Sequence, residues 1–191
     1  MVMYLSIVFV AMIIVSLFNI VFSTGPIWFI ILAVIGCTAF QFAIDGVVAL
    51  IINHLPDKWF GIDKKCFLVS KKCQKFYEKL KIRKWKDKVW ELGGLGGFRK
   101  NKLNDPNSKE YIEQFIIESN KGIVTHRISY FMGFLAIFLF PFKYAFIIAV
   151  PIACVNIILN ILPTMILRYN IPKLRALYTR LSRQEEKDII S

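Results

Sequence analysis

Apolar residues form two long blocks along the chain, and a polar segment separates them. The first block covers residues 1–52 and contains no Asp, Glu, Lys or Arg before Asp45. The turn-forming residues 23–26, Ser-Thr-Gly-Pro, divide it into the stretches 1–22 and 27–52. Since a membrane-spanning helix needs about 20 predominantly apolar residues, this pattern predicts a helical hairpin. A signal peptide fits residues 1–22 less well, because they lack a basic leading region and the apolar run is too long.

The second block covers residues 128–167 and is too long for a single crossing. Pro141-Phe142-Lys143 interrupts it, which predicts one helix over about 128–141 and another over about 144–167. The first of these is short for a span, so a re-entrant or interfacial segment is the alternative there.

Positive charge is concentrated outside the apolar blocks. Residues 54–127 hold 18 Lys or Arg against 9 Asp or Glu, and residues 168–191 hold 6 against 3. Because positively charged loops stay on the cytoplasmic side, four crossings place both termini and residues 54–127 in the cytoplasm. With 56% apolar residues and a net charge of +12, this segregation excludes an ordinary soluble domain.

The predicted fold is therefore an all-α integral membrane protein with about four transmembrane helices. We expect four parts: a transmembrane hairpin over 1–53, a basic cytoplasmic segment with an interfacial helix over 54–127, a second transmembrane hairpin over 128–167, and a basic cytoplasmic tail over 168–191.

The four cysteines, at positions 37, 66, 73 and 154, show no metal-binding or disulfide pattern. No pair has the C-x-x-C spacing of structural zinc sites, and His54 and His126 stand apart from other metal ligands. We therefore expect reduced cysteines, no metal and no bound cofactor.

Residues 56–90 combine Lys and Arg with aromatic residues, among them Trp85 beside Lys86. Such a mixture can bind nucleic acid through phosphate pairing and base stacking. Next to membrane spans, lipid headgroups are the better match, because Trp and Tyr favour the interface and each Lys near an anionic leaflet gains on the order of 1 kcal/mol. We expect membrane lipids and no nucleic acid as partners. An equally good explanation of these basic residues is that their charge only sets the orientation of the spans in the membrane.

Residues 91–100 are rich in glycine, with four glycines between positions 93 and 97. They predict a loop, whose backbone N–H groups beside basic side chains can hold a phosphate or a thioester oxygen. Gly97 and Lys100 are therefore candidate substrate-binding residues. The G-K-[ST] ending of a P-loop is absent, and a flexible connector is the simpler explanation.

Residues 108–127 have the pattern of an amphipathic helix that leads into the third span, with Ser108 as its N-cap. The apolar stripe consists of Ile112, Phe115, Ile116, Ser119 and Ile123. His126 lies on this stripe where the chain enters the bilayer, and Glu118 precedes it by eight positions. An imidazole shielded from bulk water can act as a general base. A histidine that only bonds to a headgroup or a carbonyl is the alternative.

Asp45, Asn156 and Asn160 are among the polar residues within the predicted spans, where polar groups are costly. Asp45 is expected to pair with a basic residue or with an amide of another helix. Asn156 and Asn160 lie four apart and therefore share one helix face. Both helix–helix contact and substrate contact explain these asparagines.

Several motifs follow one another in the order of a known family. They are Pro56-Asp57-Lys58-Trp59-Phe60, Ile82-Arg83-Lys84-Trp85-Lys86-Asp87, Gly97-Phe98 with Lys100 and Leu103, Glu118 with His126, Asn160 with Pro163, and Arg168-Tyr169-Asn170-Ile171-Pro172-Lys173-Leu174. Over about residues 50–180, this series resembles the glycosyl-4,4'-diaponeurosporenoate acyltransferase family of bacterial membrane proteins.

The resemblance implies transfer of a fatty acyl chain to the sugar of a glycosylated carotenoid, in a bacterial cell membrane. It implies catalytic roles for His126 as the base and Glu118 as the acid that orients it. Arg168, Tyr169 and Asn170 would then contact substrate, as would Asn160, Trp85 and Lys86. An acyl donor such as acyl-CoA would be a co-substrate, attracted by basic residues 81–88. No Ser/His/Asp or Cys/His pattern is present, which favours direct transfer.

Two other functions remain open at the level of sequence. The same basic and aromatic residues suit a non-enzymatic membrane scaffold or lipid-binding protein. A small membrane methyltransferase also has few spans and basic ends, but only the glycine-rich loop is available for S-adenosylmethionine.

Overall fold

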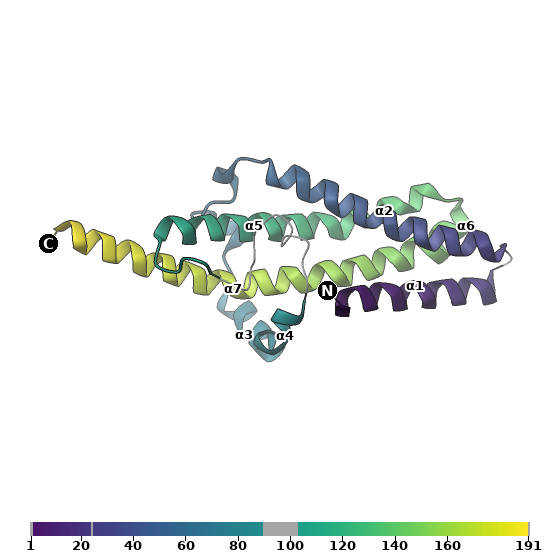
Figure 1. Ribbon diagram of the computed structural model, residues 1–191, viewed down its shortest axis with the longest axis horizontal. Coiled ribbons are helices and arrows are strands. Elements are labelled where there is room, and N and C mark those ends of the chain that lie inside the picture. The colour runs from purple at the N-terminus through teal and green to yellow at the C-terminus, as the bar shows by residue number, and fades with distance from the viewer. Residues whose placement is uncertain (1, 24, 90–102, 191) are drawn as a thin grey trace.

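The computed structural model of the chain consists of helices and connecting turns (Figure 1), and it describes residues 2–23, 25–89 and 103–190. No strand occurs in these ranges. Four of the described helical segments are long and apolar enough to cross a membrane: Leu5–Phe22, Ile27–Asn53, Lys109–Leu139 and Phe142–Ile189. The all-α membrane fold with about four spans is thereby confirmed.

The N-terminal hairpin consists of α1 (Val2–Phe22) and α2 (Ile27–Asn53). Pro26 stands at the N-cap of α2, where its fixed φ of −61° suits the start of a helix. Asn19 of α1 is buried, and its amide nitrogen donates to the carbonyls of Val15 and Ile147, both at 2.8 Å. The second bond joins α1 to the C-terminal half of the chain.

The helix that contains the third predicted span begins well before residue 128. Helix α5 spans Lys109–Met132 and continues as a 3-10 helix, Gly133–Leu139. Ser108 Oγ accepts from the N–H of Tyr111 at 3.1 Å, so the predicted N-cap is confirmed. The boundary expected between 127 and 128 falls inside this helix, because the apolar stripe of residues 112–123 is covered by another helix and the backbone can continue in helical form.

The covering helix is α7 (Val150–Ile190), which is 41 residues long. The chain breaks at Pro141 as expected and then forms α6 (Phe142–Tyr144) and a π-helical segment, Ala145–Ala149, before α7 begins. At 1.5 Å per residue α7 is about 60 Å long, roughly twice the thickness of a bilayer core. It therefore extends well beyond the membrane, and the boundary expected at 167/168 lies inside it.

The α5–α7 pair has its own core outside the apolar spans. The buried residues of this core are Ile112, Phe115, Ile116, Ile123, Leu167, Ile171, Leu174 and Leu181. The stripe that predicted an interfacial helix is thus buried against α7 and contacts protein instead of lipid.

The directions of the long helices determine on which side of the molecule the chain termini and residues 54–89 lie. Helices α1 and α5 run towards the turns near residues 23–26 and 140–141, and α2 and α7 run back (Figure 1). The start of α1, the segment 54–89 and the end of α7 consequently lie on the side away from those turns. We call this side the polar end.

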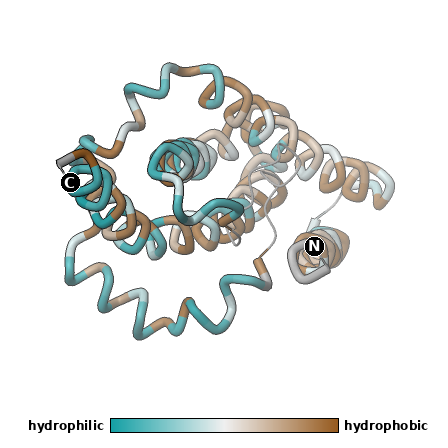
Figure 2. Tube along the Cα trace, turned by 60° about the vertical axis from the view of Figure 1, so that its left-hand side comes forward, coloured by the Kyte–Doolittle hydropathy of each residue, from teal (hydrophilic) through white to brown (hydrophobic). Residues whose placement is uncertain are grey.

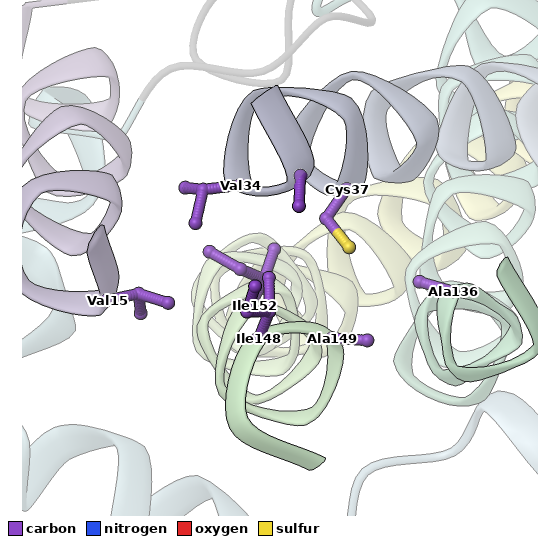
Figure 3. Close-up of a cluster of buried hydrophobic side chains, with 8 residues drawn as sticks. Val15, Val34, Cys37, Ala136, Ile148, Ala149 and Ile152 are labelled. Atoms are coloured by element: carbon purple, nitrogen blue, oxygen red, sulfur yellow. The ribbon is translucent and has the colours of Figure 1, made fainter. Parts of the chain in front are cut away.

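The membrane-spanning parts of the helices pack against one another through small side chains. Ala33, Cys37, Ala136 and Ala149 meet larger residues such as Ile148 in one buried cluster (Figure 3). Small residues let helices approach closely where lipid offers no hydrophobic driving force. Large side chains such as those of Phe9, Phe22, Phe138 and Phe142 are exposed on the outside, as in a membrane-facing surface.

Residues 54–89 form a series of short helices that curves around α5 and α7 (Figure 2). It contains the 3-10 turns Asp57–Trp59 (η1), Lys65–Phe67 (η2) and Lys86–Lys88 (η3), and the helices α3 (Lys71–Lys79) and α4 (Ile82–Trp85).

A buried lysine fastens this segment to α5. The side chain of Lys121 is 7% exposed, and its Nζ lies 2.6 Å from Asp57 Oδ1 and 3.4 Å from the Asn53 carbonyl. The adjacent Asn120 donates to the carbonyl of Phe60 at 2.8 Å. Residues 53–60 are therefore held on α5 by a charged hydrogen bond and a neutral one. On α7, Arg175 donates to the carbonyl of Ile62.

We expect Asp57→Asn to destabilise the protein by about 1–3 kcal/mol, because it weakens a charge-assisted bond to a buried ammonium. Adding Lys121→Met to the variant should recover stability, since the uncompensated buried charge is then removed. Melting temperature in detergent measures both effects. Asp63→Asn is the matched control, because Asp63 and its partner Lys64 are both exposed. Equal melting of Asp57→Asn and the wild type would contradict this role.

Candidate functional site

Helix α7 carries polar residues at every fourth position through its apolar part: Asn156, Asn160, Thr164 and Arg168. Residues four apart share a helix face, so they form one line, which we call the α7 stripe. The first three are 5–6% exposed. A buried polar group in a membrane span is costly unless it is hydrogen-bonded, and the stripe finds its partners on α5 and α2.

The centre of the stripe joins three helices. His126 Nδ1 on α5 lies 2.8 Å from Asn160 Oδ1 on α7. Asn160 Nδ2 donates in turn to Asp45 Oδ2 on α2 at 3.2 Å. An imidazole, an amide and a carboxylate thus form a line where the apolar spans meet the polar end.

The surroundings of Asn160 determine which nitrogen of His126 carries the proton. Besides Asp45, Asn160 Nδ2 has Asn156 Oδ1 and the Asn156 carbonyl within 3.0 Å. An amide NH₂ only donates and an amide oxygen only accepts, so Asn160 Oδ1 accepts from His126. The neutral imidazole therefore carries its proton on Nδ1, and its basic lone pair is on Nε2.

Deeper in the membrane the polar contacts continue. Asn156 Nδ2 lies 3.5 Å from Asp45 Oδ1 and 3.4 Å from the carbonyl of Ser129. Gln41 of α2 donates to the carbonyl of Gly133 at 3.1 Å. Two buried oxygens, Gln41 Oε1 and Ser129 Oγ, have no hydrogen-bond partner among the described residues. These two oxygens, at the end of the network farthest from the polar end, can therefore accept further hydrogen bonds.

Towards the polar end, the stripe opens into a groove between α3, α5 and α7. Tyr130 of α5 donates to Thr164 Oγ1 at 2.7 Å, and Thr164 donates to the carbonyl of Asn160 at 3.0 Å. Both residues line the groove, which has a volume of about 580 Å³. Its polar lining consists of Lys72, Tyr77, Arg127, Tyr130, Thr164 and Arg168. We call it the cationic groove.

The predicted catalytic residues are separated in the structure. Glu118 accepts from Gln114 at 2.9 Å and lies 3.8 Å from Lys121 Nζ. It precedes His126 by eight positions on the same helix, which is about 12 Å of helical rise. A polar partner of His126 is the side-chain amide of Asn160 on α7, at 2.8 Å.

The predicted substrate-binding residues after the last span point in different directions. Arg168 Nε donates to the Tyr77 hydroxyl at 3.1 Å and lines the cationic groove. Tyr169 is 6% exposed, and its hydroxyl accepts from Lys173. It packs with Ile82 in a buried cluster, so its contacts are with protein. Asn170 is half-buried.

The remaining predicted residues lie away from this network or outside the described chain. Trp85 Nε1 donates to the carbonyl of Leu80 at 3.0 Å, which closes the turn between α3 and α4. Lys86 follows it at the end of α4 and is half-buried. Gly97 and Lys100, with the rest of the glycine-rich loop, lie outside the described residues.

Several residues of the network and the groove were not predicted as site residues: Gln41, Lys72, Tyr77, Arg127, Ser129, Tyr130 and Thr164. The four-residue spacing of Asn156 and Asn160 continues to Thr164 and Arg168, so the sequence did contain a signal for Thr164. Tyr130 and Arg127 gave no such signal, because their roles depend on which face of α5 meets α7.

Gly133→Ala is expected to destabilise the protein. A Cβ there would lie 3.0 Å from Asn156 Nδ2 and 3.2 Å from Gln41 Oε1, and both of these side chains are buried. Gly36→Ala is the matched control, because its Cβ would meet nothing within 4 Å and a helix interior gains about 1 kcal/mol from alanine. The melting temperature should fall for Gly133→Ala and hold or rise for Gly36→Ala. A similar rise for both would contradict close packing at Gly133.

Comparison with protein families gives one match. The family model described as glycosyl-4,4'-diaponeurosporenoate acyltransferase matches residues 56–180, which is more than half of the chain. The comparisons with curated proteins and with solved structures find no match. The matched range includes His126, the α7 stripe and the cationic groove.

Proposed function

Because the chain belongs to the glycosyl-4,4'-diaponeurosporenoate acyltransferase family, we propose that it transfers a fatty acyl chain to a sugar hydroxyl of a glycosylated carotenoid or related glycolipid. The observation that carries the proposal is the line from His126 through Asn160 to Asp45. Family membership favours acyl transfer over a methyltransferase or a scaffold.

His126 is the general base. Its Nδ1–H bond to Asn160 fixes the ring and leaves the basic lone pair on Nε2. An acyltransferase must deprotonate the acceptor hydroxyl as its oxygen attacks the acyl carbonyl. Nε2 receives this proton, a C–O bond forms, and the carbonyl becomes a tetrahedral oxyanion. When the bond to the leaving group breaks, the imidazolium returns the proton to that group.

Asn160 and Asp45 are positioning residues. As His126 gains charge in the transition state, the carboxylate of Asp45, two hydrogen bonds away, stabilises the imidazolium through the Asn160 amide. Glu118 is engaged with Gln114 and Lys121, so we assign the orientation of His126 to Asn160. Arg168 and Arg127, near the end of the stripe, provide positive charge for the oxyanion or an anionic substrate group.

The location of the site suits an amphipathic substrate. The α7 stripe runs from buried Asn156 among the apolar spans to half-exposed Arg168 at the polar end. Acyl and polyene chains therefore remain in lipid while the reacting groups meet at the boundary. The excess of Lys and Arg at the polar end favours a cytoplasmic orientation for it, with both termini inside a bacterial cell membrane.

His126→Gln is expected to lower the rate of acyl transfer by about 10²–10⁴-fold, the usual contribution of a general base. The variant keeps a side chain that can donate to Asn160 but cannot exchange the proton. The assay measures transfer of a radiolabelled acyl chain to glycosylated carotenoid in purified membranes. His54→Gln is the matched control, because the exposed ring of His54 bonds to the Leu50 carbonyl of its own helix. Full activity of His126→Gln would contradict the assignment.

Asn160→Ala is expected to lower kcat by about 10²-fold, the typical cost of misplacing a catalytic group. The pH profile of kcat should also change shape, because Asn160 no longer determines which ring nitrogen is protonated. Loss of folded protein alone would lower kcat by the same factor at every pH. An unchanged profile would therefore show that Asn160 serves packing and does not position His126.

A further inference from the structure

Among the described residues, the cationic groove is lined by three basic side chains and no acidic one. Lys72 comes from α3, Arg127 from α5 and Arg168 from α7. None of them forms an ion pair with a carboxylate of the described residues, whereas Lys64, Lys109 and Lys121 each do. Three like charges in one groove repel one another, so the arrangement suits an anion from outside the chain.

One of these cations is already held in position. Arg168 Nε donates to the hydroxyl of Tyr77 at 3.1 Å, and Tyr77 is buried in the cluster formed by α4 and α7. This bond uses one of the five N–H donors of the guanidinium and reduces the ordering cost of binding. Guanidinium groups bind phosphate oxygens in pairs, which makes phosphate the best-matched anion.

The position of the groove favours a ligand with both a charged and an apolar part. Arg127 and Arg168 immediately flank the apolar stretch 128–167, the level at which lipid phosphates lie. Phe76 and Met165 contribute apolar walls beside the cations. A volume of about 580 Å³ is within the range of small-molecule sites. A phosphate group attached to an acyl chain satisfies all of these features.

The groove is also connected to the catalytic histidine. Its floor contains the Tyr130–Thr164 hydrogen bond, and Thr164 bonds to the carbonyl of Asn160, the partner of His126. The groove therefore adjoins the part of the α7 stripe that holds the imidazole.

We propose that the cationic groove binds the phosphate of the acyl donor, with Lys72, Arg127 and Arg168 as the specificity-determining residues. The inference rests on the proposed acyl transfer and names its donor site. The donor is a phosphorylated acyl carrier, either a coenzyme A thioester or a phospholipid. The site differs from basic residues 81–88, which the sequence had suggested for this role.

Binding is tested without turnover, using the full-length protein in a neutral detergent and isothermal titration calorimetry. Coenzyme A probes the thioester source, and dihexanoylphosphatidylglycerol probes the phospholipid source. Dihexanoylglycerol, which lacks the phosphate, is the ligand control. The wild type should bind one phosphorylated probe, and the probe that binds identifies the source. Each of Arg127→Gln and Arg168→Gln should weaken that binding by about 10-fold or more.

Matched variants separate the groove from general positive charge. Lys75→Gln on α3 and Arg180→Gln on α7 each remove an exposed cation outside the groove. Lys84→Gln removes one from the segment 81–88. All three should bind the probe as the wild type does. Arg168→Lys, which keeps the charge, should recover part of the loss, and melting temperatures should confirm that each variant is folded.

The outcomes distinguish this inference from the proposed function. His126→Gln should retain binding while it loses transfer, and the groove variants should raise the KM of the donor without changing that of the sugar acceptor. The inference is overturned if the wild type binds neither phosphorylated probe, if the groove variants bind as the wild type does, or if Lys84→Gln weakens binding equally. Acyl transfer that survives in His126→Gln would overturn the proposed base and leave the groove result standing.

Discussion

The structure depends on one constraint: a polar side chain inside an apolar helix must find a hydrogen-bond partner, because lipid provides none. Helix α7 carries such side chains at every fourth position from Asn156 to Thr164, and they are bonded to α5 and α2. These bonds determine which faces of the three helices meet and in what register. Gly133 leaves room for these side chains, since the amides of Asn156 and Gln41 occupy the space that a Cβ would need.

The same bonds organise the chemistry. The amide that joins α5 to α7 also fixes the tautomer of His126, and through it the carboxylate of Asp45 acts on the ring. At the outer end of the stripe, Thr164 and Tyr130 form the floor of the cationic groove. Stability and the proposed catalysis therefore depend on the same contacts. Kinetic measurements are needed to separate the effect of a substitution in the stripe on catalysis from its effect on stability.

The polar segment between the hairpins contributes a second type of contact. Residues 56–60 are held on α5 by Lys121 and Asn120, which gives Asp57 a structural role. Further along, Tyr77 of α3 meets Arg168 and thereby brings Lys72 to the groove. Residues far apart in the chain thus form the polar end, although each local segment consists only of short helices.

The class of fold followed from the sequence, because apolar length and charge segregation depend on composition along the chain and not on packing. The sequence also predicted the helix cap at Ser108 and the break at Pro141, and it drew attention to His126, Asn156 and Asn160 as polar residues among apolar ones. Tertiary structure alone decided that His126 bonds to Asn160 instead of Glu118, and that Arg127, Arg168 and Lys72 share a groove. Those pairings depend on the rotation and register of helices that meet across the bundle. Periodicity within one helix cannot specify them, because it describes a face and not the partner that covers it.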